Sequence, residues 1–364
     1  MSTSRGTTRT SRTSRASRPS FAIGSVKVRP GHTREIGLPI TKLVTGAEVS
    51  LPVRVFHGRE HGPTVWINAA IHGDEVVGVE VIRRVLATLS AKTLRGTLIA
   101  VPIVNVHGFM AGDRYLPDRR DLNRSFPGSH RGSLAGRIAH LFMSEVVDKC
   151  EVGIDLHTGS DRRTNLPQVR ADLDDPRTRE LAEAFGAPIM LHAKVRDGSL
   201  RAAARERGAT VLLVESGEAM RFDAWAIEAG VEGVRRVLAA LGMIDPTDSP
   251  HPAHASAPTP ALVSRRSGWV RSGRSGIVHL DVTLGQRVEV GTRLGGLSDS
   301  FGKTLQLVKA DRAGVIIGRT TAPLVNRGDA LVHIAEIEGA EPPGTPDHPD
   351  AAEGFDALDE IPVL

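Results

Sequence analysis

The chain has 364 residues, 40% of them apolar, which is enough for about two domains with buried cores. No apolar run reaches the roughly 18–20 residues that cross a bilayer, so no membrane association is expected. The single cysteine, Cys150, excludes an internal disulfide and is typical of a reducing compartment, and we predict a cytoplasmic protein.

The net charge of +4 originates in the N-terminal segment. Residues 1–20 contain five arginines and no acid, so the remaining chain sums to 4 − 5 = −1. Such a tract cannot bury apolar surface, and we predict a disordered basic tail over residues 1–20. A transit peptide or weak attraction to nucleic acid stays open for this tail, but no specific nucleic-acid partner is expected. Residues 339–364 are acidic and predict a second flexible tail.

Over residues 21–244, short β-type runs alternate with helical hydrophobic periods. The pattern predicts strands at residues 64–71, 97–103, 151–156, 188–191 and 210–214, and helices at 75–89, 134–147 and 222–241. Strands that alternate with helices favour an α/β domain with a largely parallel or mixed sheet. Ligands of such domains bind in loops at the carboxyl ends of the strands.

Residues 245–260 hold several prolines among small polar residues and predict a linker. The linker contains His251 and His254, but a Pro-rich segment does not preorganise metal ligands. Residues 261–338 change to short β runs with glycine turns and predict a separate small β domain.

This predicted β domain contains an internal repeat. The pattern at Val288, Gly291 and Leu294 recurs at Val325, Gly328 and Leu331. Two such halves resemble the β-barrel sandwich of biotinyl/lipoyl-type domains. Lys303 lacks the methionine neighbours typical of biotinylation, so we expect a solvated turn lysine. The domain is expected to pack against the α/β unit and to help wall its active site.

Two separated motifs supply metal-ligand side chains. His72 and Glu75 follow a predicted strand directly, and His157 follows a later one. Two imidazoles and one carboxylate are the three-ligand set of a catalytic zinc, with the fourth position left for water or substrate. Asp155 faces the same way as His157 on a strand and could hold its ring. Glu215 ends an apolar run, and a free carboxylate near a metal suits amide hydrolysis.

Between these motifs, residues 112–128 form an arginine-rich, non-regular segment. The planar guanidinium binds carboxylates through two hydrogen bonds, so arginines near a hydrolytic metal predict an acidic substrate or a developing oxyanion. We assign this function to Arg114 and Arg124. Arg119 and Arg120 are interpreted as solvated loop residues.

Four motifs together resemble the succinylglutamate desuccinylase/aspartoacylase family of the zinc-carboxypeptidase superfamily: H-G-D-E at 72–75, D-L-N-R-S-F-P-G at 121–128, D-L-H-T-G at 155–159 and Glu215. The resemblance covers about residues 50–335 and implies a mixed-sheet, zinc-carboxypeptidase-like α/β domain. The resemblance also implies one Zn²⁺ per chain on His72, Glu75 and His157. The other implied residues are Glu215 as the acid/base, Arg114 beside the scissile carbonyl, Asn123 with Arg124 on the substrate carboxylate, and Asp121 on the His72 ring.

One departure from the family concerns tyrosine. Relatives commonly use a substrate-contacting tyrosine from the later part of the chain, whereas the only tyrosine here is Tyr115. This contact must be absent or replaced. Of all the properties that the resemblance implies, the identity of the substrate is therefore the one that it determines least.

These observations predict a zinc-dependent hydrolase that cleaves the amide bond of a small N-acyl amino acid or an analogue. A metallocarboxypeptidase acting on peptide C-termini would use the same ligands and stays open as an alternative. The third hypothesis is a non-enzymatic metal-binding protein, in which Glu215 would have no role. The expected partner is a small molecule, with no membrane partner, and homo-oligomerisation is left open.

Overall fold

A computed structural model describes residues 18–160, 162–246 and 260–339. Most of the two predicted tails and of the predicted linker, with His251 and His254, lies outside the described residues. Arg18, which we assigned to the basic tail, is described. Its guanidinium donates hydrogen bonds to the carbonyl oxygens of Gly58 and Gly96 at 2.9 and 2.8 Å, so contacts of the fold begin before residue 21.

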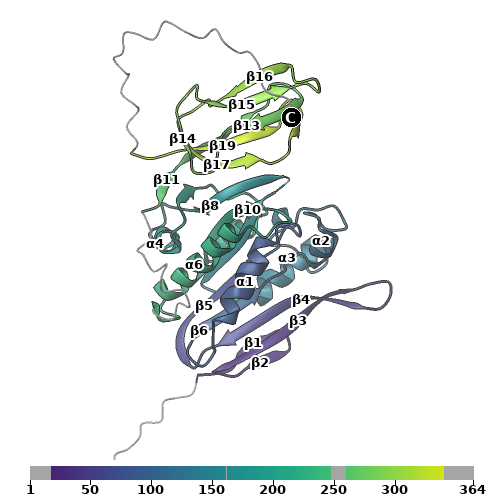
Figure 1. Cartoon of the computed structure of the whole chain (residues 1–364). Coiled ribbons are helices and arrows are strands. Elements are labelled where there is room, and N and C mark those ends of the chain that lie inside the picture. The colour runs from purple at the N-terminus through teal and green to yellow at the C-terminus, as the bar shows by residue number, and fades with distance from the viewer. Residues whose placement is uncertain (1–17, 161, 247–259, 340–364) are drawn as a thin grey trace, which may run out of the picture.

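The N-terminal two thirds of the described chain alternate strands and helices (Figure 1). The strands are β1 (Phe21–Ile23), β2 (Val26–Val28), β3 (His32–Lys42), β4 (Glu48–His57), β5 (Glu60–Ala69), β6 (Arg95–Val101), β7 (Val152–Gly159), β8 (Arg163–Ala171), β9 (Ile189–His192) and β10 (Thr210–Glu218). The helices are α1 (Val77–Ala87), α2 (Val106–Ala111), α3 (Leu134–Glu145), α4 (Pro176–Phe185), α5 (Leu200–Glu206) and α6 (Ala224–Ala240), with short 3₁₀ turns η1 (Leu122–Arg124) and η2 (Val147–Lys149).

The later strands form the C-terminal part of the described chain. They are β11 (Leu262–Ser264), β12 (Arg266–Arg271), β13 (Gly276–Leu280), β14 (Arg287–Val288), β15 (Arg293–Ser298), β16 (Thr304–Lys309), β17 (Gly314–Thr320), β18 (Leu324–Val325) and β19 (Ala330–Glu336). None of the helices in the described residues combines the length and apolar character needed to cross a membrane.

One large mixed sheet crosses both parts in the order β12-β19-β17-β8-β10-β7-β5-β6-β4-β3. Its centre is parallel, with β10, β7, β5 and β6 side by side, and antiparallel strands β8 and β4 flank this centre. The predicted α/β class with a mixed sheet is therefore confirmed. Parallel strands place their carboxyl ends at one edge, which is where the candidate ligands gather.

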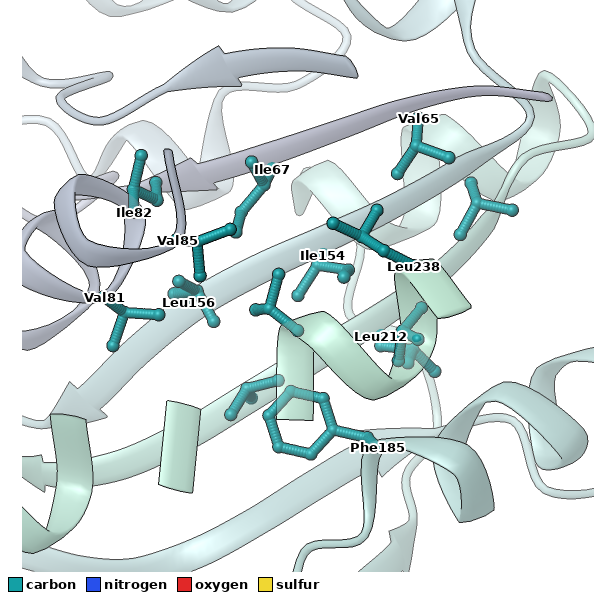
Figure 2. Close-up of a cluster of buried hydrophobic side chains, with 14 of the residues drawn as sticks. Val65, Ile67, Val81, Ile82, Val85, Ile154, Leu156, Phe185, Leu212 and Leu238 are labelled. Carbon is teal, nitrogen blue, oxygen red and sulfur yellow. The ribbon is translucent and has the colours of Figure 1, made fainter. Parts of the chain in front are cut away.

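Helices cover both faces of the sheet. On one face, α1, α4 and α6 bury a cluster that includes Val81, Phe185 and Leu238 against β5, β7 and β10 (Figure 2). On the other face, α3 and α5 pack with Trp66 and Ile99. Each fully buried side chain of this size contributes about 1.5–3 kcal/mol, so these two layers fix the position of the central strands.

Local signals set the helix boundaries. The Asp175 carboxylate accepts a hydrogen bond from Thr178 N at the start of α4, and Pro176 occupies the first helical position, where it loses no intrahelical hydrogen bond. Ser133 caps α3 in the same way, by accepting from Gly136 N.

The C-terminal strands reproduce the repeat found in the sequence. Gly276 of β13 pairs with Val325 of β18, and Gly314 of β17 pairs with Val288 of β14, so the first strand of each half pairs with the short strand of the other. Residues of both halves share one apolar core. Lys303 is exposed, as expected, in the loop between β15 and β16.

The C-terminal strands are joined to the large sheet by hydrogen bonds. β17 pairs antiparallel with β8, with Gly318 opposite Asn165, and β11 pairs parallel with β9. The two parts are therefore continuous across one sheet, and Figure 1 shows the C-terminal strands stacked beyond β8 and β10.

Every strand and helix predicted for residues 64–241 overlaps an observed one, but two strands continue further at their carboxyl ends than predicted. β7 continues to Gly159 and β10 to Glu218, so His157 and Glu215 lie inside strands rather than after them. β8, α2, α4 and α5 were not predicted. β8 carries polar and apolar residues in no regular alternation, because it lies inside the sheet with polar side chains facing a cavity.

Candidate functional site

The turn between β5 and α1 places His72 and Glu75 on one side of the chain. The Glu75 backbone N–H donates to the His72 carbonyl oxygen at 3.2 Å. Gly73 permits this turn to approach α2, because a Cβ atom there would lie 2.0 Å from the Gly108 carbonyl carbon. Close packing of the turn against α2 therefore requires a glycine between the two predicted ligands.

Three side chains that can ligate a metal converge at this turn. His72 Nδ1 lies 2.7 Å from Glu75 Oε1, and His157 Nδ1 lies 2.7 Å from Glu75 Oε2. All three residues are buried, and their donor atoms lie within 4.8 Å of one another. Two imidazole nitrogens and a carboxylate, buried and mutually close, are a donor set that suits a divalent metal such as zinc.

A carboxylate holds the far nitrogen of each imidazole. Asp121 Oδ1 lies 3.2 Å from His72 Nε2, and Asp155 Oδ2 lies 3.0 Å from His157 Nε2. Asp155 is held in turn by the Asn68 amide, which donates to its Oδ1 at 2.6 Å. Carboxylates in these positions fix the ring orientation of metal-binding histidines and leave Nδ1 directed at the shared centre.

The charges of the cluster are coupled. Burial alone would raise the pKa of the Glu75 carboxyl, but the adjacent His72 and His157 outweigh burial and hold this pKa well below its usual range. Burial would lower the pKa of His157, but Asp155 and Glu75 raise it well above its usual value. The centre therefore favours positive charge, whether protons or a cation supply it.

Arg114 lies at the edge of the cluster. Its Nη1 contacts Glu75 Oε1 at 3.2 Å, and its Nη2 contacts Asp121 Oδ2 at 3.1 Å. These two contacts orient the guanidinium beside the predicted metal ligands.

Glu215 lies next to His157 across the parallel pair β10–β7, where the two residues are register partners. Asn165 Nδ2 donates to Glu215 Oε2 at 2.9 Å, and Arg170 Nη1 lies 3.7 Å from Oε1. Both Glu215 and His157 line the same cavity. The structure thus brings the predicted acid/base residue to the predicted ligands.

Asn123 and Arg124 also line this cavity. The Asn123 Oδ1 accepts from Leu200 N at 2.9 Å, which orients the amide and leaves Nδ2 as its donor. Asp121 begins the 3₁₀ turn that carries both residues, by accepting from Asn123 N at 2.8 Å.

The cavity has a volume of about 820 Å³ and is strongly cationic. Its acidic side chains are Glu75, Glu215 and Glu336, whereas its basic ones are Arg114, Arg124, Arg163, Arg170, Lys194, Arg196, Arg201, Arg265, Arg266 and Arg312. Among the described residues, Arg201 Nη1 and Arg170 Nε are buried without a hydrogen-bond partner. Burial, together with repulsion from Arg170, lowers the pKa of Arg201 to about 10.

The sequence did not single out several cavity residues. Asn165 and Arg170 lie on the unpredicted strand β8, and Trp269 and Arg312 come from the C-terminal part. No motif marks them, although Asn165 and Arg170 do follow closely after D-L-H-T-G. Tyr115 is 45% exposed and is not among the cavity residues, so it does not replace the tyrosine contact of relatives.

Comparison with known proteins gives consistent matches. The protein-family model of the succinylglutamate desuccinylase/aspartoacylase catalytic domain matches residues 61–241 of the sequence. N-alpha-acetyl-L-2,4-diaminobutyric acid deacetylase of Halomonas elongata is 30% identical over 300 residues, which are 79% of this chain and 86% of that protein. A succinylglutamate desuccinylase of Burkholderia mallei is 31% identical over 185 residues, 44% of this chain and 51% of that protein.

Solved structures agree. The succinylglutamate desuccinylase/aspartoacylase from Rhodobacter sphaeroides superposes with a TM-score of 0.74 at 27% identity, covering 84% of this chain and 96% of that one. The product-bound ectoine utilization protein EutE (DoeB) from Ruegeria pomeroyi gives 0.76 at 25% identity, covering 88% and 98%. With these matches and the motifs in their expected order, the chain belongs to the succinylglutamate desuccinylase/aspartoacylase family.

Proposed function

We propose that this protein is a zinc-dependent deacylase that hydrolyses the amide bond of a small N-acyl amino acid or a close analogue. The observation that carries the proposal is the convergence of His72, Glu75 and His157, with Glu215 beside His157 at the same cavity. The names of the relatives support amide hydrolysis, since they include a deacetylase and succinylglutamate desuccinylases.

In this proposal His72, Glu75 and His157 hold the ion, and Asp121 and Asp155 orient the two imidazoles. A bound zinc ion supplies Lewis acidity and lowers the pKa of a water towards about 7. Glu215 accepts the proton of the attacking water and later delivers it to the leaving nitrogen. Arg114 donates hydrogen bonds to the carbonyl oxygen as negative charge develops on it, a contact whose loss typically costs about 3–4 kcal/mol of barrier.

The charge of the cavity supports an anionic substrate. Asn123 and Arg124 are proposed to bind the substrate carboxylate through charge-assisted hydrogen bonds. The unpartnered nitrogens of Arg170 and Arg201 add donors in the same cavity, and a buried donor without a partner favours a ligand that supplies an acceptor.

We further propose that residues 261–338 form a β-barrel-sandwich domain that narrows the entrance to the cavity. The crossed pairing of the two halves and their shared core support this architecture. Arg265, Trp269 and Arg312 line the cavity, which favours a small substrate over a peptide.

The deciding experiment is replacement of Glu215 by Gln, with metal content and turnover both measured. We expect one zinc per chain to remain and kcat on N-acetyl or N-succinyl amino acids to fall by about 10²–10⁴-fold, because the base is lost. Unchanged kcat would refute the assignment.

A substrate screen tests the reaction class. N-acetyl amino acids, N-succinyl amino acids and short peptides are assayed with and without a chelator. We expect chelator-sensitive cleavage of acyl amino acids. Cleavage of peptides alone would favour the carboxypeptidase alternative, and full activity after removal of the metal would contradict the metal-dependent mechanism.

A further inference from the structure

The Glu215 carboxylate is held from the neighbouring strand β8. Asn165 Nδ2 donates to Oε2 at 2.9 Å, and Arg170 Nη1 lies 3.7 Å from Oε1. Asn165 is 5% exposed, so water does not compete freely for this amide. The shorter contact fixes the direction in which one carboxylate oxygen points.

The other side of the Asn165 amide meets the C-terminal part of the chain. Gly318 of β17 is the register partner of Asn165 on β8. A Cβ atom on Gly318 would lie 2.8 Å from Asn165 Oδ1 and 3.4 Å from both Trp269 and His333. Glycine at this position therefore leaves the space that the amide occupies. Figure 1 shows β17 at the boundary between the two parts, next to β8.

From these contacts we propose that Asn165 is a positioning residue for Glu215 and that Gly318 of the C-terminal part sets the position of Asn165. The inference rests on the proposed role of Glu215 as the base. In this proposal the C-terminal strands do more than narrow the cavity. They influence catalysis through a series of contacts that runs from Gly318 through Asn165 to Glu215.

The substitution Gly318→Ala tests this series of contacts directly. The φ angle of Gly318 is not in the left-handed region, so alanine causes no backbone strain there. The atom that must move is the end of the flexible Asn165 side chain, which keeps the folding cost small. We expect kcat to fall by about 10- to 100-fold, because a misplaced catalytic group loses its alignment, while KM and the metal content stay unchanged.

A matched control separates this effect from a general effect of alanine. Gly296→Ala lies in β15 of the same part, and its Cβ would meet only the Gln306 carbonyl oxygen at an ordinary 3.6 Å. We expect wild-type kcat for this variant.

A double-mutant cycle tests whether both residues act through one path. Asn165→Ala should reduce kcat as Gly318→Ala does, and the double variant should be no slower than Asn165→Ala alone, since the displaced amide is then missing. Multiplied losses in the double variant, or wild-type kcat for Gly318→Ala, would overturn the proposal.

The variant Asn165→Asp supplies a readout that a purely structural role would not move. A second carboxylate beside Glu215 would repel it when both are ionised, so the acidic limb of the kcat/KM profile should shift to higher pH. If Gly318→Ala does not fold, Asn165→Asp and Asn165→Ala still test whether Asn165 positions Glu215. An acidic limb at the wild-type pH, together with unchanged kcat, would contradict that role. If Glu215→Gln keeps full kcat, the proposed function itself fails instead.

Discussion

Two groups of histidine and acidic side chains in the described residues have donor atoms within 4.8 Å of one another. The first is His72, Glu75 and His157. The second is Asp172, Asp174 and His192, where the imidazole nitrogens lie 4.0 Å from Asp172 and 3.8 Å from Asp174. Proximity alone therefore does not distinguish them.

Burial and charge balance do distinguish them. In the second group the carboxylates are already paired, Asp172 with Arg205 at 2.9 Å and Asp174 with Arg265 at 2.7 Å, and the Asp174 side chain is 64% exposed. In the first group the ligand residues are buried, and the carboxylates of Glu75, Asp121 and Asp155 are opposed by a single guanidinium among the described residues, that of Arg114. A buried excess of carboxylate favours a cation, whereas an exposed, neutralised group does not.

Removal of a ligand from the first group should have the largest effect. For His157→Ala we expect metal content to fall from about one ion per chain to near zero and kcat to fall by at least about 1,000-fold. Asp174→Asn, from the second group, should keep both values. Metal analysis by mass spectrometry and steady-state kinetics check the pair; loss of metal from Asp174→Asn would reverse the comparison.

Removal of a supporting carboxylate should have an intermediate effect. Asp155→Asn replaces the carboxylate beside His157 Nε2 by a neutral amide, whose single acceptor oxygen is also required by the Asn68 amide, and losses at such positions typically weaken metal affinity by about 10–100-fold. Competition with a chelating dye measures this affinity. Asp172→Asn is the matched control, and equal affinities for the two variants would show that Asp155 does not support the ring.

A fourth histidine, His333, sharpens the comparison, because it is buried and none of its described contacts is with a carboxylate. His333 stacks on Trp269 with ring centroids 4.6 Å apart, and its Nε2 lies 3.0 Å from Ser267 Oγ. Burial, with repulsion from Arg170 and Arg312, lowers the pKa of His333 from 6.5 to about 3.

The folded pKa of His333 lies below the unfolded value, so its stabilising effect is complete above about pH 6.5 and is lost as pH falls towards 3. Between pH 7 and pH 5 we expect the free energy of unfolding to decrease by about 2 kcal/mol more in the wild type than in His333→Asn. Denaturant unfolding of the metal-loaded protein at both pH values measures the difference. Equal decreases would show that His333 is protonated in the fold.

Local patterns in the sequence predicted the fold class and much of the site. The apolar periods located β5, α1, β7, β10 and α6, and H-x-x-E placed two donors on one turn. Asp155 precedes His157 by two residues, so their shared face followed from strand geometry.

Other features depended on contacts between distant segments. β8 lacks a regular apolar alternation because it lies between β10 and β17 with Asn165 and Arg170 facing the cavity. The tail assignment of Arg18 overlooked its hydrogen bonds to Gly58 and Gly96, since nothing near Arg18 in the chain indicates them.

The sequence by itself determined the family, the strand–helix order and the identity of the three donor residues, because each of these is written in short motifs and in periods of neighbouring residues. The tertiary structure decided which side chains orient Glu215 and how cationic the cavity becomes. Those properties arise where β17 pairs with β8 and where arginines from separate segments meet, and hydrogen bonds between strands distant in the chain leave no local pattern to read.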